Sequence, residues 1–145
     1  MSAMSQDFLA RGKEVLAAQP FSKFVGARLL RLSAENVELG LAIKPEHMQQ
    51  YDFVHGGVLA YLADNALTFA GGIVLGHGVV TAEMKINYIK PAIGSELIAR
   101  ASPVSKGRTM VVARCDIYVT NNGVEKLCAV AQGTITPIGE KAPVE

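Results

Sequence analysis

The stretch QQYDFVHGGVLAYLADNA, residues 49–66, carries the signals that decide the fold. A histidine and two glycines precede a run in which apolar residues recur at i, i+3 and i+4 spacing as far as Ala70. This spacing predicts a helix with a broad apolar face, which begins near Gly57 and is weakened and then ended by the glycines at 71, 72, 76 and 78. A single carboxylate, Asp64, interrupts the apolar run, so the most hydrophobic helix of the chain carries a charge.

Alternating apolar and polar residues on both sides of this helix predict β-strands. One long helix combined with a meander of antiparallel strands indicates an α+β fold in which the helix packs on one face of the sheet. A short helix capped by Ser5 is expected at the start of the chain, and Asn-Asn-Gly at 121–123 predicts a hairpin turn. The strands are expected at residues 27–32, 37–43, 80–88, 95–104, 109–120 and 124–136.

The composition argues against several classes of function. The net charge is +1 without a block of like charges, and Trp is absent, so neither nucleic acid nor a membrane is expected as a partner. Half of the residues are hydrophobic and 19% are charged, which is typical of a globular domain. Cys115 and Cys128 fit no metal or redox spacing and are expected to be buried thiols. Charges near the N-terminus and short apolar runs predict a soluble cytoplasmic protein.

The order of elements, His-Gly-Gly at 55–57 and TAEMKINYIKPA at 81–92 resemble the hotdog-fold acyl-CoA thioesterases. The resemblance is to the phenylacetate-pathway (PaaI-like) branch of the 4-hydroxybenzoyl-CoA thioesterase superfamily. It implies a long central helix wrapped by one antiparallel sheet. The expected segments are an N-terminal helical segment at 1–20, the hotdog domain at 21–138 and a C-terminal tail at 139–145. The implied reaction converts medium-chain or aromatic acyl-CoA to free acid and CoA, with no cofactor beyond the substrate's own coenzyme A.

The resemblance also implies catalytic roles for individual residues. Asp64 holds the place of the acid that activates water or attacks the thioester. Gly56 would give its backbone N–H to the thioester carbonyl, Gln49 would help to hold the carbonyl or the water, and Thr81 would position the water or the acid. The family commonly has Asn in place of Gln49, and often has Gly in place of Asp52, so this chain departs from the pattern in the loop before the helix.

Independently of the resemblance, the helix start favours the same chemistry. The positive end of the helix dipole and a glycine without a side chain suit a site for a developing oxyanion. His55 is expected to bind the loop backbone rather than to act as a base, and His47 and His77 have no partners at metal-ligand spacing. We therefore expect no metal. The expected substrate-binding residues lie beside the helix or at strand ends: Gly57, Leu59, Tyr61 and Met48 for the acyl group, and Lys90, Lys106 and Arg108 for the phosphates of coenzyme A.

A distance argument predicts the oligomeric state. Gly56 and Asp64 are eight residues apart, which is about 12 Å along a helix at ~1.5 Å per residue. One thioester carbon cannot lie about 3 Å from both. If both residues act, Gly56 and Gln49 of one subunit must face Asp64 and Thr81 of another, which predicts a homodimer or a dimer of such dimers.

Two alternatives remain open at this stage. A non-catalytic acyl-CoA-binding protein would use the same pocket without turnover. A hotdog hydratase or dehydratase would need a His–acid pair, and His55 and Asp64 are too far apart on one helix to form it within one chain.

Overall fold

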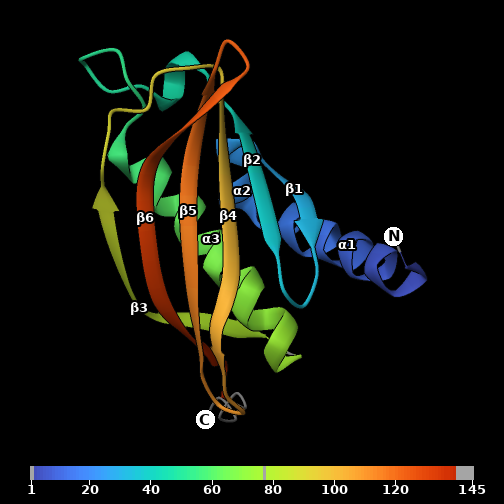
Figure 1. Cartoon of the computed structure of the whole chain (residues 1–145). Coiled ribbons are helices and arrows are strands. Elements are labelled where there is room, and N and C mark those ends of the chain that lie inside the picture. The colour runs from blue at the N-terminus through green and yellow to red at the C-terminus, as the bar shows by residue number, and fades with distance from the viewer. Residues whose placement is uncertain (1, 77, 140–145) are drawn as a thin grey trace, which may run out of the picture.

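A 20-residue helix, α3 (Gly56–Leu75), lies against one face of a six-stranded antiparallel sheet (Figure 1). The computed structural model describes residues 2–76 and 78–139, so His77 and most of the expected tail at 139–145 lie outside the described residues. This architecture confirms the predicted α+β class, with one long helix wrapped by one sheet. The sheet order is β1-β2-β4-β5-β6-β3. Its strands are β1 (Ala27–Leu32), β2 (Val37–Ala42), β3 (Val79–Tyr88), β4 (Glu96–Lys106), β5 (Val111–Asn121) and β6 (Val124–Pro137).

The core forms between α3 and the inner face of the sheet. Leu62 and Leu67 of α3 are fully buried, as are Leu97 and Ile117 of the sheet. By length and hydropathy alone α3 could also span a membrane, but half of that stretch is buried inside the protein. The glycines at 71 and 72 do not end α3, which continues to Leu75 and stops where Gly76 adopts a left-handed conformation with φ of 77°.

The start of the chain differs from the sequence prediction. The first helix, α1 (Ala3–Ala17), begins two residues before Ser5, so the predicted start of this helix is wrong by that amount. A second helix, α2 (Pro20–Val25), was not predicted, because its six residues are too few for a helical period to be recognised. Figure 1 shows both helices on the side of the sheet edge formed by β1.

The predicted meander is wrong for β3. Of the four described strands that follow α3, only β4, β5 and β6 are neighbours in chain order, whereas β3 pairs with β6 at one edge of the sheet. The connection at 89–95 crosses the ends of β6 and β5 to reach β4, and the N–H groups of Ile89 and Lys90 both donate to the Cys128 carbonyl on the way. Apolar alternation identifies a strand but not its neighbours, so this crossing could not be seen in the sequence.

A β-bulge interrupts β3. Thr81 is paired with Ile135 and Glu83 with Thr134, so that Ala82 is an extra residue without a partner in β6. The sequence predicted that Val80 and Ala82 share a face with Met84, but both are exposed while Thr81 and Met84 are partly buried. The bulge therefore turns Thr81 toward α3.

Two adjacent glycines in α3 allow a test of this packing. A Cβ at Gly71 would lie 2.5 Å from Ile135 of β6, so we expect Gly71→Ala to lower the free energy of unfolding by about 1–3 kcal/mol. At Gly72 the nearest atom would be 3.4 Å away, and Gly72→Ala should raise stability by up to ~1 kcal/mol through helix propensity. Urea denaturation of both variants measures the difference, and equal effects would contradict the packing described.

The two buried cysteines give a second prediction. Burial raises the pKa of the Cys115 thiol to about 12 and that of Cys128 to about 11. Because the thiolate is the reactive form, native protein at pH 8 should not react with a chromogenic disulfide, whereas unfolded protein should show both thiols. Rapid labelling of the native protein would show that one of these strands opens readily.

Candidate functional site

The loop that leads into α3 is held by its own backbone. Gln49 N–H donates to the Phe53 carbonyl at 2.9 Å, and Met48 and Val54 form an isolated β-bridge. His55 N–H donates to the carbonyl of His47 at 2.8 Å. These bonds place Gln49 and His55 close to the first turn of α3 in a defined arrangement.

His47 is a structural residue in this loop. Its side chain is buried, and Nδ1 accepts a hydrogen bond from Lys44 N–H at 3.0 Å. Nε2 lies 2.7 Å from the carbonyl of Val25 at the end of α2, so Nε2 carries the proton and donates it. The neutral ring thereby connects the loop to α2.

Asp52 occupies the position where the resembled family often has glycine. Its φ is 65°, in the left-handed region that glycine adopts without strain. This chain therefore has an aspartate at a position where the backbone conformation favours glycine. The neighbouring Gln49 folds back so that its Oε1 accepts a hydrogen bond from Tyr51 N–H, which leaves its NH₂ group as the part able to donate to a ligand.

His55 is the N-cap of α3. Its Nδ1 accepts a hydrogen bond from Gly57 N–H at 2.8 Å, which occupies one of the free donors of the first turn. Gly56 N–H has no hydrogen-bond partner within residues 2–76 and 78–139. This donor stands at the positive end of the helix dipole, where it can bind a carbonyl oxygen that becomes negatively charged.

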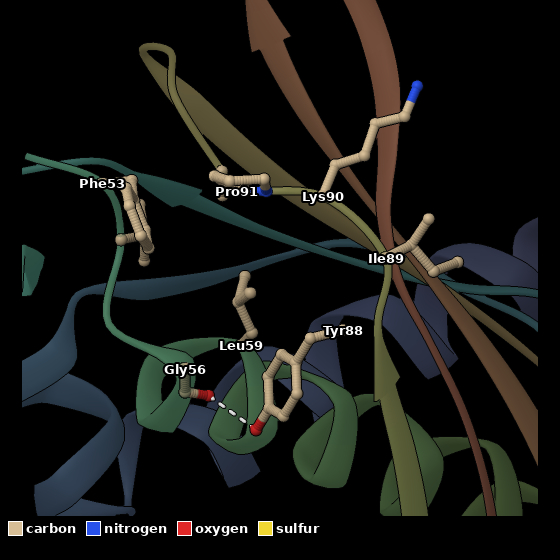
Figure 2. Close-up of a pocket in the computed structure, with 9 residues that line it drawn as sticks. Phe53, Gly56, Leu59, Tyr88, Ile89, Lys90 and Pro91 are labelled. Carbon is tan, nitrogen blue, oxygen red and sulfur yellow. Dashed lines mark hydrogen bonds between the residues drawn. The ribbon is translucent and has the colours of Figure 1, made fainter. Parts of the chain in front are cut away.

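An apolar pocket of about 310 Å³ lies beside this donor (Figure 2). It contains three of the predicted site residues, Gly56, Leu59 and Lys90. The sequence reasoning assigned no role to the others, although Tyr88 and Pro91 stand in the stretch TAEMKINYIKPA that carried the resemblance. Figure 2 shows Leu59 near Gly56 and Tyr88, with the amine of Lys90 pointing away. The remaining lining residues are Phe53, Val54, Tyr88, Ile89, Pro91 and Ala92.

Asp64 and Thr81 form a separate group two turns further along α3. The Thr81 hydroxyl donates to Asp64 Oδ1 at 2.5 Å, and both residues are partly buried. Among the described residues, the Asp64 carboxylate has no other hydrogen bond and no ion pair. Asp64 does not line the pocket, and because α3 is continuous from Gly56 the separation of about 12 Å applies.

Tyr61 and Met48 do not reach the pocket in this chain. The Tyr61 hydroxyl donates to Ser22 Oγ at 2.6 Å and accepts from Asn65 Nδ2 at 2.9 Å. These bonds anchor α2 to α3, so Tyr61 has a structural role that its helical spacing did not reveal. Met48 is partly buried against the core and is absent from the pocket lining.

The three predicted cations are not brought together within one chain. Lys106 ends β4 and its Nζ lies 2.6 Å from Glu35 Oε1, while Arg108 follows in the next turn. Lys90 lies near the opposite end of β4, which at 11 residues is about 35 Å long. Of the three, Lys90 alone lines the pocket, and the binding of coenzyme A phosphates by these cations stays a prediction.

Comparisons with known proteins agree with the fold and identify a family. Residues 51–126 match the thioesterase superfamily. Human acyl-coenzyme A thioesterase 13 is 29% identical over 139 residues, which cover 94% of this chain and 96% of the human protein.

Two solved structures show the same arrangement of elements. A thioesterase family protein from Silicibacter pomeroyi superposes with a TM-score of 0.86 at 30% identity, over 91% of this chain and 99% of that one. The Escherichia coli PaaI protein of the phenylacetic acid degradation operon shares the fold with a TM-score of 0.82 at 20% identity, over 94% and 97% of the two chains.

The left-handed Asp52 gives a prediction about the loop. Asp52→Gly should raise the free energy of unfolding by about 0.5–1 kcal/mol, because glycine relieves the cost of the positive φ. Gln50→Gly, two residues earlier and at an ordinary φ, is the matched control and should be destabilising. Thermal unfolding of both variants checks the sign, and a loss of stability in Asp52→Gly would contradict the loop conformation.

Proposed function

The chain belongs to the thioesterase superfamily and is a thioester hydrolase, and from this we propose that it cleaves medium-chain or aromatic acyl-CoA at a site shared by two subunits. One observation carries the proposal. The free Gly56 N–H beside an apolar pocket and the Asp64 carboxylate beside Thr81 are complementary halves of a hydrolytic site. They lie too far apart on one helix to act on the same carbon.

The size and lining of the pocket support the proposed acyl groups. A volume of about 310 Å³ is near the lower end of the ~300–1,000 Å³ typical of ligand pockets. Phe53 and Tyr88 supply aromatic surface, and Leu59 supplies aliphatic surface. Such a pocket favours a compact acyl group with an apolar or aromatic body over a long chain.

In the proposed mechanism, Gly56 N–H and the Gln49 NH₂ group polarise the thioester carbonyl. The negative charge that develops on the carbonyl oxygen is stabilised by these donors and by the start of α3. Asp64 has one oxygen held by Thr81, so its other oxygen can take a proton from water or attack the carbonyl carbon. In the first route the water oxygen forms the new C–O bond, the C–S bond breaks, and the proton taken by Asp64 passes to the leaving thiolate. In the second route Asp64 forms a mixed anhydride as the C–S bond breaks, and water then hydrolyses this anhydride and restores the carboxylate. Both routes yield the free acid and coenzyme A.

Symmetry supports the dimer. A two-fold axis that places Gly56 of one subunit opposite Asp64 of the other must pass nearest to the residue midway between them, Ala60. Ala60 is small and only partly buried, so a second helix can approach it closely. Strand β3 lies at one edge of the sheet and offers unpaired backbone groups for the same association.

Activity against a panel of acyl-CoAs tests the proposal. Release of free thiol should be fastest with medium-chain or aromatic acyl groups, and Asp64→Asn should reduce kcat by about 10²–10⁴-fold. Thr81→Val should cause a smaller loss, of about 5–10-fold, because it removes one hydrogen bond to the carboxylate. Binding without turnover across short, long and aromatic acyl groups would instead indicate a non-catalytic binder.

Subunit complementation tests the shared site directly. Gly56→Pro and Asp64→Asn homodimers should each be inactive, since proline at this first helical position removes the backbone N–H and asparagine removes the carboxylate, so that each lacks one half of both sites. When the two variants are mixed and allowed to re-form dimers, about one quarter of wild-type activity should return, because half of the dimers are mixed and each contains one intact site of two. A site built within one subunit would regain nothing on mixing.

A further inference from the structure

We propose that Tyr88 is a positioning residue that helps to fix the peptide unit between Gly56 and Gly57, and thereby the backbone torsions of Gly56 that aim the N–H of the preceding peptide at the substrate carbonyl. The inference rests on the proposed function and deepens it. Tyr88 is the last residue of β3 and lines the pocket. Neither the sequence pattern nor the roles implied by the family resemblance assign it a role.

Among the described residues, the hydroxyl of Tyr88 makes one hydrogen bond. It donates to the Gly56 carbonyl at 3.1 Å, the interaction drawn as a dashed line in Figure 2. The residue is 54% exposed, so burial alone does not hold the ring in place. The bond joins the edge strand to the first turn of α3 at the site of the free donor.

The same peptide unit is held from its other end. Its N–H belongs to Gly57 and donates to His55 Nδ1 at 2.8 Å, while its C=O belongs to Gly56 and accepts from Tyr88. Two side chains from different elements therefore fix one peptide plane. The donor N–H of Gly56 belongs to the preceding peptide. Because Gly56 has no Cβ to restrict its torsions, these two bonds support the helical geometry that sets the direction of this N–H.

The ring of Tyr88 stands beside Gly56 where a side chain would begin. Gly56 does not adopt a positive φ, so backbone conformation does not require glycine there. A Cβ would lie 3.3 Å from Tyr88 Cε1 and 3.4 Å from Cζ, so the ring occupies that side of the residue. Tyr88 thus borders the oxyanion donor with its ring and orients it with its hydroxyl.

Donors that are oriented before the reaction stabilise charge that appears only in the transition state. Loss of the Tyr88 hydroxyl should therefore lower kcat and leave KM nearly unchanged, whereas a lost substrate contact would raise KM. Loss of the whole ring should in addition widen the pocket and shift preference toward bulkier acyl groups.

The test compares Tyr88→Phe with Tyr118→Phe. Tyr118 is a matched control, because its side chain lies on the opposite face of the sheet, below Arg100 at 5.0 Å. We expect Tyr88→Phe to lose about 5–20-fold in kcat with KM within twofold of wild type, and Tyr118→Phe to match wild type. A kcat for Tyr88→Phe within twofold of wild type, or a loss confined to KM, would overturn the proposal.

Amide resonances give a readout that does not depend on turnover. In ¹⁵N-labelled protein, Tyr88→Phe should shift the Gly56 and Gly57 signals and speed hydrogen exchange at Gly57, while Tyr118→Phe should not. Unchanged Gly56 and Gly57 signals would overturn the positioning role. If these signals shift but the wild-type protein hydrolyses no acyl-CoA, the proposed function fails while the positioning of the peptide stands.

Discussion

The rigid spacing along α3 is the constraint on which the rest of the site depends. The helix carries a free backbone donor at its first residue, Gly56, and a carboxylate two turns later at Asp64. A helix cannot shorten to bring them together, so the distance between them is set by its rise per residue. The pocket therefore lies in one half of the site and the carboxylate in the other. In the proposed function, a second subunit supplies the half that is missing from each.

Strand β3 holds both halves of the site against the helix. Thr81 bonds Asp64 near one end of the strand, and Tyr88 bonds Gly56 at the other. They are seven positions apart in the sequence. Because seven is odd, a regular strand would place the two side chains on opposite faces. The extra residue at Ala82 reverses this alternation, so that Thr81 and Tyr88 both face α3. The bulge is therefore a requirement of the site and more than a local irregularity.

The polar residues around α3 are used mainly to hold backbone and side chains in position. His47 bonds Lys44 and Val25, and His55 caps the helix through Gly57, so both rings are engaged by the backbone. The buried Asn65 donates to Tyr61 and ties α3 to the short helix α2. The buried side chains of His47, Asn65 and Ser22 each meet a partner, as the cost of an unpaired polar group requires. Against this background the free N–H of Gly56 and the free oxygen of Asp64 mark the reactive groups.

The sequence by itself determined the elements and the main chemistry of this protein. Helical and strand periodicity placed α3 and all six strands to within a few residues, because each pattern reflects which side chains must be buried. His-Gly-Gly and Asp64 marked the two halves of the candidate site, and helix geometry showed that they are separate. Only the tertiary structure decided the strand order, the bulge at Ala82, the anchoring of Tyr61 and the distance between Lys90 and Lys106. These depend on contacts between residues remote in the chain, which local periodicity does not encode.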